Sequence, residues 1–220
     1  MKKKEFFNFN IKLLNTRELK LGKEQADKAC IVLHGWGANK DDLVPLLQTL
    51  NLKQYHCFFP DAPFDVSGTF GQGKSWFSFP LNKESEKEFL ESKTELLNYL
   101  YGIKKRGFDL KDIVFLGFSQ GGAMSLEMFL SNKTRIGGVI VLSGFLINEL
   151  QYVMLNNDMK KTPLFIAHGH NDNILPFEES KQSAENLKNM GLNIMWREYP
   201  MAHEISANEI DDIRKFLDSI

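Results

Sequence analysis

The sequence lacks the features that would attract it to nucleic acid or to a membrane. Its 27 lysines and arginines against 28 aspartates and glutamates give a formal charge of −1, which excludes strong electrostatic attraction to either partner. No apolar run approaches the ~18 residues that a membrane span requires. The lysines at the start are followed by Glu5 instead of the apolar core of a secretory signal. We therefore expect a soluble, cytoplasmic protein with no nucleic-acid partner and no integral membrane association.

Cysteine is almost absent as well, since only Cys30 and Cys57 are present. Two isolated cysteines offer neither the ligand spacing of a zinc site nor a disulfide framework. Each lies in an apolar run, so both are expected to be buried, unreactive thiols.

What the sequence does have is a series of short apolar runs. Runs that are apolar on both faces are typical of a parallel sheet covered by helices. They span residues 30–34, 56–60, 113–118, 138–143, 163–168 and 193–199. Residues 6–14 differ, because apolar and polar side chains alternate there and predict a half-buried strand at a sheet edge.

Helical patterns separate most of these runs. Ser85 and Glu88 have the spacing of a capping box, and Ser206 and Glu209 repeat it. Gly107, after three basic residues, predicts a left-handed end to the first of these helices. The predicted helices are residues 85–106, 121–131, 177–190 and 206–219. Strands that alternate with helices predict a mainly parallel α/β sheet with right-handed crossovers.

The chain shows no internal repeat, low-complexity tract or linker, so residues 1–220 are predicted to form a single α/β domain. Two connections, 61–80 and 144–160, are too long for plain turns and are rich in large apolar side chains. Connections beyond ~12–15 residues in a compact domain are usually functional or disordered. Aromatic content argues against disorder, so both are expected to pack near a binding site.

The central chemical signal is the pentapeptide 117–121, GFSQG, a G-x-S-x-G motif between an apolar run and a helix. A serine raised on a sharp strand-to-helix turn has a strained backbone, and its neighbours two residues away must be small. The turn also aims the N–H of Gln120 at the place where an oxyanion would form. By itself the motif is also compatible with a glycine-rich surface loop around Ser119.

A serine nucleophile needs a base and an orienting carboxylate at the same end of the sheet. Asp172 stands four residues past the run 163–168, and His203 stands four residues past the run 193–199. All three groups therefore follow the C-terminal ends of strands, where open parallel sheets bind ligands. The order Ser, Asp, His is the order of an α/β-hydrolase.

A second oxyanion donor and the remaining histidines are the other candidates for functional residues. A second oxyanion donor is expected from LHGWGANKDD at 33–42, where two glycines free the backbone around Trp36. His34 has no acid at a strand end to pair with, so a structural role is favoured over a catalytic one. His168 and His170 form an H-x-H pair, but no further ligand is clustered with them, and no metal is predicted.

These segments together resemble the small carboxylesterase, lysophospholipase and acyl-protein thioesterase family of α/β-hydrolases, in a bacterial form. The matching stretches cover about residues 31–205 and include IVLHGWGANKDDLVPLL, GKSWF, IVFLGFSQGGAMSLEM, HGHNDNILPF and YPMAHEI. The resemblance implies an α/β-hydrolase fold, with a mainly parallel central sheet, helices on both faces and no large lid domain. It also implies hydrolysis of esters or thioesters that carry an acyl chain, without a cofactor.

The resemblance carries the family's site onto residues of this chain. The catalytic triad falls on Ser119, Asp172 and His203, and the backbone oxyanion donors fall on Trp36 and Gln120. Substrate contacts are expected at four further positions, Phe70, Trp76, Phe145 and Leu175.

Three positions depart from the family pattern. Trp36 stands where leucine is usual, Asp61 replaces the commoner His or Thr before Ala-Pro, and Ser78 stands where Asp is common. Only the backbone of Trp36 is needed for an oxyanion, so the catalytic assignment is unaffected. All three lie beside the expected pocket, which leaves substrate preference open.

The favoured function is a serine carboxylesterase or acyl thioesterase that acts through a Ser-His-Asp triad and an acyl-enzyme. Its expected partner is a small-molecule or lipid-like ester, and the chain is expected to be a monomer or a homodimer. One alternative is a phospholipid-directed phospholipase or lysophospholipase, although 220 residues leave little room for a large lid. The other is a catalytically silent binding module on the same fold.

Overall fold

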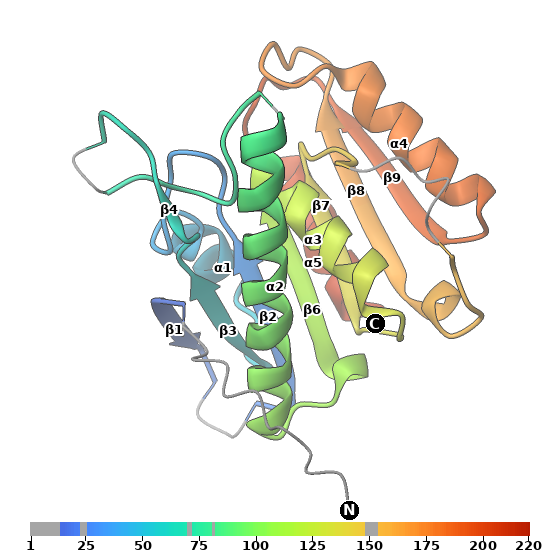
Figure 1. The fold of residues 1–220 in the computed structure, drawn as a ribbon. Coiled ribbons are helices and arrows are strands. Elements are labelled where there is room, and N and C mark those ends of the chain that lie inside the picture. Colours follow the sequence, from blue (N-terminus) through green and yellow to red (C-terminus); the bar gives the residue numbers. More distant parts are fainter. Residues whose placement is uncertain (1–13, 23–25, 70–71, 81, 148–153) are drawn as a thin grey trace, which may run out of the picture.

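A seven-stranded sheet forms the centre of the computed structural model, which describes residues 14–22, 26–69, 72–80, 82–147 and 154–220 (Figure 1). Its order is β1-β3-β2-β6-β7-β8-β9, and every neighbouring pair is parallel except β1 and β3. The strands are β1 (Thr16–Lys20), β2 (Lys28–Leu33), β3 (Tyr55–Pro60), β6 (Ile113–Phe118), β7 (Gly138–Leu142), β8 (Pro163–Gly169) and β9 (Asn193–Tyr199). The mainly parallel sheet predicted from the apolar runs is confirmed.

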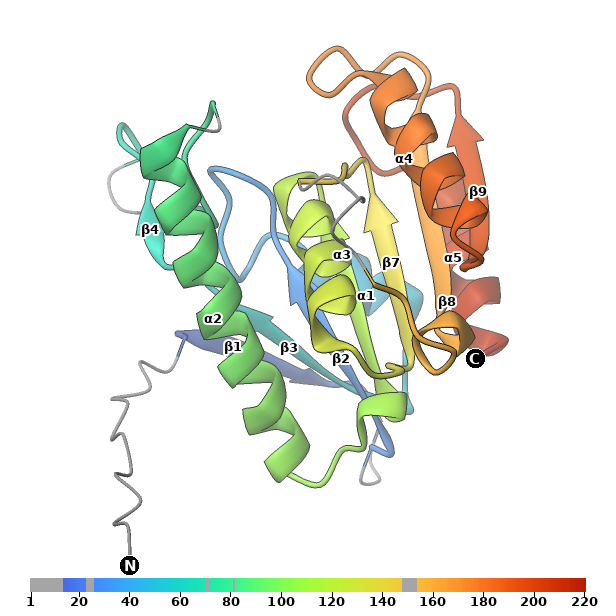
Figure 2. The ribbon, with the colours of Figure 1, turned by 45° about the vertical axis from the view of Figure 1, so that its right-hand side comes forward.

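Helices cover both faces of this sheet (Figures 1 and 2). On one face lie α2 (Lys83–Lys105), α3 (Gln120–Asn132) and α4 (Phe177–Asn189), and on the other lie α1 (Val44–Leu50) and α5 (Ala207–Asp218). Each face has its own buried cluster, around Leu96 and Met124 on the first and around Leu47 and Ile213 on the second. Among the residues that the structure describes, no lid domain is inserted between these elements.

Helix α2 begins two residues earlier than predicted, and Ser85–Glu88 is not its capping box. The cap is Asn82, whose Oδ1 accepts the N–H groups of Glu84 and Ser85, while the Ser85 hydroxyl accepts the N–H of Asn82. The carboxylate of Glu88 instead accepts the N–H of Ser78 at 2.7 Å. The error arose because Ser85 is the inner member of the box, at the third position of the helix, where its side chain is buried.

The other helix ends follow the sequence closely. Ser206 and Glu209 form the predicted capping box of α5, with the N–H of Glu209 donating to the Ser206 hydroxyl. Gly107 has φ +106° just beyond α2, a backbone conformation that glycine adopts without strain. Local hydrogen-bond chemistry therefore sets these boundaries.

The antiparallel edge of the sheet was not predicted where it occurs. The predicted strand 6–14 lies outside the described residues except for its last position, and the described edge strand is β1. Glu18 on β1 accepts a bidentate pair of hydrogen bonds from Arg106 at the end of α2, at 2.8 and 3.0 Å. A contact across 88 residues thus ties the edge strand to a distant helix.

The long connection 61–80 carries a short ribbon that the sequence did not indicate. Its two strands, β4 (Phe64–Asp65) and β5 (Lys74–Ser75), pair antiparallel. The second connection, 144–160, ends in a turn of 3₁₀ helix at Met159–Lys161. Among the described residues, no helix combines the length and the apolar character needed to span a membrane.

Candidate active site

Ser119 lies on the turn between β6 and α3, at the C-terminal end of a central strand. Its φ of +55° and ψ of −120° are values that a residue with a side chain adopts only at a cost of about 1–3 kcal/mol. Its N–H donates to the carbonyl of Leu142 at 2.8 Å, and its own carbonyl accepts the N–H of Ala123 at 3.1 Å. The neighbouring strand and the first turn of α3 therefore hold the strained backbone in place.

The two glycines of the motif are required by close backbone contacts. A Cβ on Gly117 would lie 2.1 Å from the carbonyl oxygen of Gly121, and one on Gly121 would lie 2.0 Å from that of Leu33. Because glycine has no side chain, α3 can start directly over the ends of β2 and β6; a larger residue at either position would collide with the backbone.

Asp172 and His203 form a close pair beyond the ends of β8 and β9. The Nδ1 atom of His203 lies 2.7 Å from Oδ2 of Asp172, whose side chain is fully buried. The other oxygen, Oδ1, accepts the N–H groups of Ile174 and Leu175, both at 2.9 Å. Burial alone would raise the pKa of Asp172, but the N–H of Leu175, His203 and the N–H of Ile174 outweigh it and hold the pKa below its usual range. Asp172 is therefore a buried carboxylate in contact with the imidazole of His203.

Backbone contacts bring this pair to the side of Ser119. The N–H of His170 donates to Tyr199 O at 2.9 Å and that of Asn171 donates to Met201 O at 3.0 Å, so the loops after β8 and β9 are joined. The ring of His203 lies 4.8 Å from that of Phe118, the residue before Ser119. The three residues predicted as a triad thus gather at one end of the sheet.

The loop after β2, which carries the predicted oxyanion donor Trp36, also passes close to Ser119. A Cβ on Gly35 would lie 3.4 Å from Cβ of Ser119. His34 stabilises this loop: its Nδ1 donates to Gly35 O at 2.8 Å, and its Nε2 accepts the N–H of Ala62 at 3.1 Å. Burial lowers the pKa of His34, which favours the neutral ring that can make both bonds. These contacts agree with the structural role predicted for His34.

The side chain of Gln120 has a role that sequence reasoning missed. Its amide is buried, and it accepts the N–H of Trp76 at 2.9 Å and donates to the carbonyl of Phe77 at 2.7 Å. The residue whose backbone is the predicted oxyanion donor therefore also fixes the aromatic segment of the connection 61–80. The sequence shows only a glutamine within the G-x-S-x-G motif, which reveals neither its burial nor its partners.

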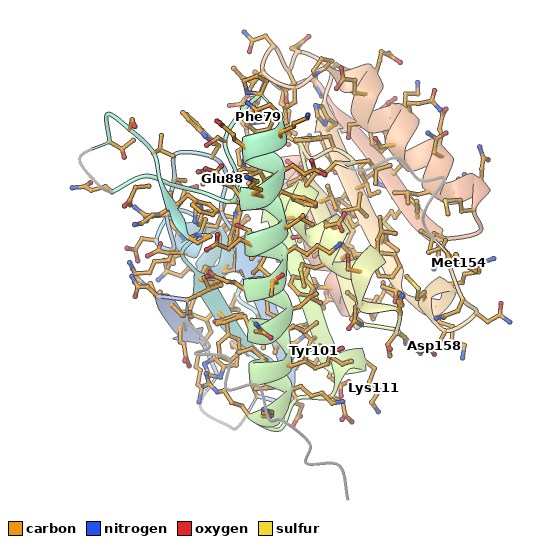
Figure 3. All side chains as sticks on the ribbon, in the orientation of Figure 1. Phe79, Glu88, Tyr101, Lys111, Met154 and Asp158 are labelled. Carbon is orange, nitrogen blue, oxygen red and sulfur yellow. The ribbon has the colours of Figure 1, made fainter. Side chains whose placement is uncertain are left out.

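The predicted substrate-contacting residues have different environments. Trp76 is fully buried and its indole donates to His34 O at 3.0 Å, so it lies in the core beneath the loops. Phe145 is half-buried, with its ring 6.1 Å from that of Phe79, which is 47% exposed at the upper end of α2 (Figure 3). Leu175 is half-buried in the loop after Asp172. Phe70 lies outside the described residues.

His168 and His170 do not form a common site. His168 is fully buried, with Nε2 2.9 Å from Leu175 O, whereas His170 is exposed and its ring lies 4.5 Å from that of Phe177. Within the described ranges, no three or more His, Cys, Asp or Glu side chains are grouped so that they could hold a metal ion.

A strained serine after a central parallel strand, with a His–Asp pair beyond two later strands of the same sheet, defines the class of α/β-hydrolases. Sequence comparison agrees, because a phospholipase/carboxylesterase family model matches residues 14–220. The chain belongs to this phospholipase/carboxylesterase family and is a hydrolase of the ester or thioester class.

Individual relatives cover nearly the whole chain. Acyl-protein thioesterase 1 from Candida albicans is 31% identical in an alignment of length 215 that covers 89% of this chain and 93% of that protein. The protein of the same name from Emericella nidulans is 30% identical in an alignment of length 212 that covers 86% of this chain and 89% of that protein.

Solved structures show the same architecture. The crystal structure of Arabidopsis thaliana SOBER1 matches with a TM-score of 0.76 and 26% identity, over 87% of this chain and 98% of that one. Esterase PE8 matches with a TM-score of 0.84 over 94% and 99% of the two chains, and at 23% identity this likeness concerns the fold alone.

Proposed function

We propose that this protein is a serine carboxylesterase that cleaves esters or thioesters bearing an acyl chain, with Ser119 as nucleophile, His203 as base and Asp172 as orienting carboxylate. The observation that carries the proposal is the 2.7 Å contact between His203 Nδ1 and Asp172 Oδ2, made beside the strained turn of Ser119. A carboxylate accepts only from a protonated Nδ1, which leaves Nε2 of the neutral ring free to take a proton.

In the first half of the reaction, His203 removes the hydroxyl proton as Ser119 Oγ attacks the substrate carbonyl. The negative charge that develops on the carbonyl oxygen is held by the backbone N–H groups of Trp36 and Gln120. His203 then gives its proton to the departing alcohol or thiol, and the acyl group remains on Ser119 as an ester.

In the second half, a water molecule takes the place of the leaving group. His203 accepts one of its protons as the water attacks the acyl-enzyme, and the same backbone N–H groups stabilise the second oxyanion. Collapse of that intermediate returns the proton to Ser119 and releases a carboxylic acid. The buried carboxylate of Asp172 stabilises the imidazolium that forms in both halves.

The acyl chain is assigned to the surface between the connections 61–80 and 144–160. Phe79 and Phe145 come from these two segments and their rings lie 6.1 Å apart. Each methylene buried against such rings contributes ~0.8 kcal/mol before ordering costs. Trp76 remains a predicted contact, and its complete burial favours the alternative that it only completes the core.

Labelling with a fluorophosphonate probe tests whether Ser119 is a nucleophile. The wild-type protein is expected to be labelled, and Ser119→Ala is expected to lose the label while staying folded. Ser183→Ala is the matched control, since Ser183 is a half-buried serine on α4 whose hydroxyl donates to Glu179 O within the same helix. Folded wild-type protein that takes up no label would favour a silent binding module.

The substrate class is tested with p-nitrophenyl esters of increasing acyl length beside acyl thioesters. Higher kcat/KM for monomeric esters or thioesters than for phospholipid substrates supports the proposal. Preference for aggregated phospholipid would instead support the phospholipid-directed alternative.

A further inference from the structure

A second histidine, His168, lies next to Asp172 of the proposed triad. His168 lies on β8, four residues before Asp172, and its side chain has no exposed surface. Its Nε2 atom lies 2.9 Å from the carbonyl oxygen of Leu175 and 3.2 Å from Oδ2 of Asp172. Neither the triad nor the oxyanion donors account for this residue.

These two neighbours settle the protonation of His168. A carbonyl oxygen and a carboxylate oxygen both accept, so Nε2 carries the proton; it donates to Leu175 O, and Oδ2 of Asp172 is the second acceptor nearby. Burial lowers the pKa of His168, which favours the neutral ring. Its Nδ1 atom is buried and has no hydrogen-bond partner among the described residues. His168 is therefore a neutral N–H donor, not a second charge beside Asp172.

With this contact, the carboxylate of Asp172 has nitrogen atoms beside both of its oxygens. Oδ1 accepts the N–H groups of Ile174 and Leu175, and Oδ2 lies 2.7 Å from His203 Nδ1 and 3.2 Å from His168 Nε2. Leu175 uses its N–H on Asp172 and its carbonyl on His168, which closes a ring of contacts around the carboxylate.

We propose that His168 is a positioning residue that fixes the orientation of the Asp172 carboxylate and weakens its pull on the proton of His203. The proposal rests on the proposed function, because it concerns the same triad. The titratable groups in contact with Asp172 are His168 from β8 and His203 from the loop after β9. The aromatic neighbours, Phe118 beside His203 and Phe177 beside His168, carry no charge.

Removal of the donor has a defined consequence. Without His168 Nε2, the whole charge of Oδ2 acts on His203, which then holds its proton to a higher pH. The carboxylate also becomes free to rotate, so the imidazole is less well aimed at Ser119. Both effects lower the turnover number at neutral pH, while substrate binding, which uses other groups, is little changed.

Three substitutions at one position separate these effects. In His168→Gln the amide nitrogen can reach the place of Nε2, in His168→Asn it reaches only that of Nδ1, and His168→Leu has no donor. For Asn and Leu we expect kcat to fall about 10- to 100-fold with KM nearly unchanged. We also expect the acid limb of the kcat–pH profile to move up by about half to one pH unit. For Gln we expect the limb to stay in place.

His170→Asn is the matched control, because His170 is two residues away and faces Phe177 and Glu198 instead of the triad. It is expected to leave kcat, KM and the pH profile unchanged. A second readout is the downfield NMR signal of the His203 Nδ1 proton, which should shift in the Asn and Leu variants and keep its position in the Gln variant.

The proposal would be overturned if the Asn and Leu variants fold but leave both the acid limb of the kcat–pH profile and the His203 Nδ1 proton signal unchanged. Loss of folding in both the Asn and the Gln variant would also overturn it, because His168 would then be a core group only. If the wild-type protein is not labelled by fluorophosphonate, the proposed function fails and this inference fails with it. If the wild type is labelled and only the limb is unmoved, the failure is confined to His168.

Discussion

Single residues at the candidate site combine strain with support from their neighbours. Ser119 keeps a positive φ because Leu142 and Ala123 bind both sides of its peptide backbone. Asp172 stays ionised in a buried position because backbone N–H groups and His203 compensate for lost hydration. The proposed chemistry therefore relies on a few groups whose environment is arranged in advance.

Ser119 and His203 are expected to act as a unit. Replacement of either by alanine should lower turnover on a p-nitrophenyl ester on the order of 10³-fold or more, and the double replacement should cost little beyond the worse single one. Steady-state kinetics of the three variants provide the measurement. A double-variant loss equal to the product of the two single losses would mean that the residues act independently.

The proposed base predicts the pH dependence of the reaction. Ester hydrolysis should rise with pH as His203 loses its proton and should then level off, because only the neutral ring can accept the Ser119 proton. The kcat/KM profile between pH 4 and 9 measures this. A rate that stays constant down to about pH 4 would remove His203 from that role.

At the scale of elements, helix α2 depends on a cap that the sequence pattern misplaced by three residues. Ser85 and Glu88 have the spacing of a capping box, but Ser85 serves as the inner partner of Asn82. Both serine and asparagine accept N–H groups well at helix starts, so spacing alone does not select between them.

The corrected cap predicts different costs for two neighbouring substitutions. Asn82→Ala should lower the free energy of unfolding by about 1 kcal/mol, because two N–H groups of the first turn lose their acceptor. Glu84→Ala is the control, since Glu84 is an exposed residue of the same turn. Urea denaturation of both variants gives the comparison. Equal losses would contradict the role of Asn82.

The connections around the site predict where acyl selectivity lies. Phe79→Ala should flatten or shift the acyl-length profile without loss of fold or of serine labelling, because Phe79 is half-exposed and contacts Phe145. Leu90→Ala, at an exposed residue of α2, is the control. Trp76→Ala is a poorer probe, because loss of a fully buried tryptophan costs about 3–5 kcal/mol of stability. An unchanged profile in stable Phe79→Ala protein would contradict the assignment.

At the scale of the whole molecule, the two faces of the sheet bury separate apolar clusters. Helix α5 packs on one of them and carries a buried ionisable side chain, Glu209. Glu209 is fully buried at the third position of α5, where Oε2 accepts the N–H of Ser206 at 3.3 Å. Its Oε1 has no hydrogen-bond partner in the described part of the chain. Burial raises the pKa of Glu209 to about 8.

This residue makes global stability depend on pH. Between the ordinary glutamate value of 4.5 and about 8, the folded state keeps a proton that the unfolded state has released. Stability should therefore fall as pH rises through this window, by up to about 1.4 kcal/mol per pH unit from this group. Below pH 4.5 both states are protonated and its contribution is constant.

Glu209→Gln should remove that pH dependence of stability, while the side-chain oxygen of glutamine can still accept the N–H of Ser206. Urea denaturation of wild-type and variant protein at pH 5, 6, 7 and 8 measures the difference. Asp211→Asn, on the exposed side of the same helix, is the control and should follow the wild type. A wild-type slope that persists in Glu209→Gln would exclude Glu209 as its source.

The elements that the sequence by itself determined are those whose causes are local. The apolar runs predicted β2, β3, β6, β7 and β8 because strands buried on both faces need no polar alternation. The run 193–199 also predicted β9, although this edge strand is exposed or half-buried along most of its length. The box at Ser206 and the glycine at position 107 marked helix ends because capping involves residues within one turn. The motif around Ser119 could be recognised partly for the same reason, since Gly117 closely approaches the carbonyl of Gly121 within the same pentapeptide, whereas Gly121 approaches the distant Leu33.

Only the tertiary structure decided which distant groups meet. The amide of Gln120 holds Trp76 and Phe77, which lie more than 40 residues earlier, and Arg106 binds Glu18 across 88 residues. His168 could be read from the sequence only as half of an H-x-H pair, and its place beneath Asp172 follows from how the loop after β8 folds back. Long-range hydrogen bonds depend on the packing of the sheet and its loops, and a local pattern carries no record of them.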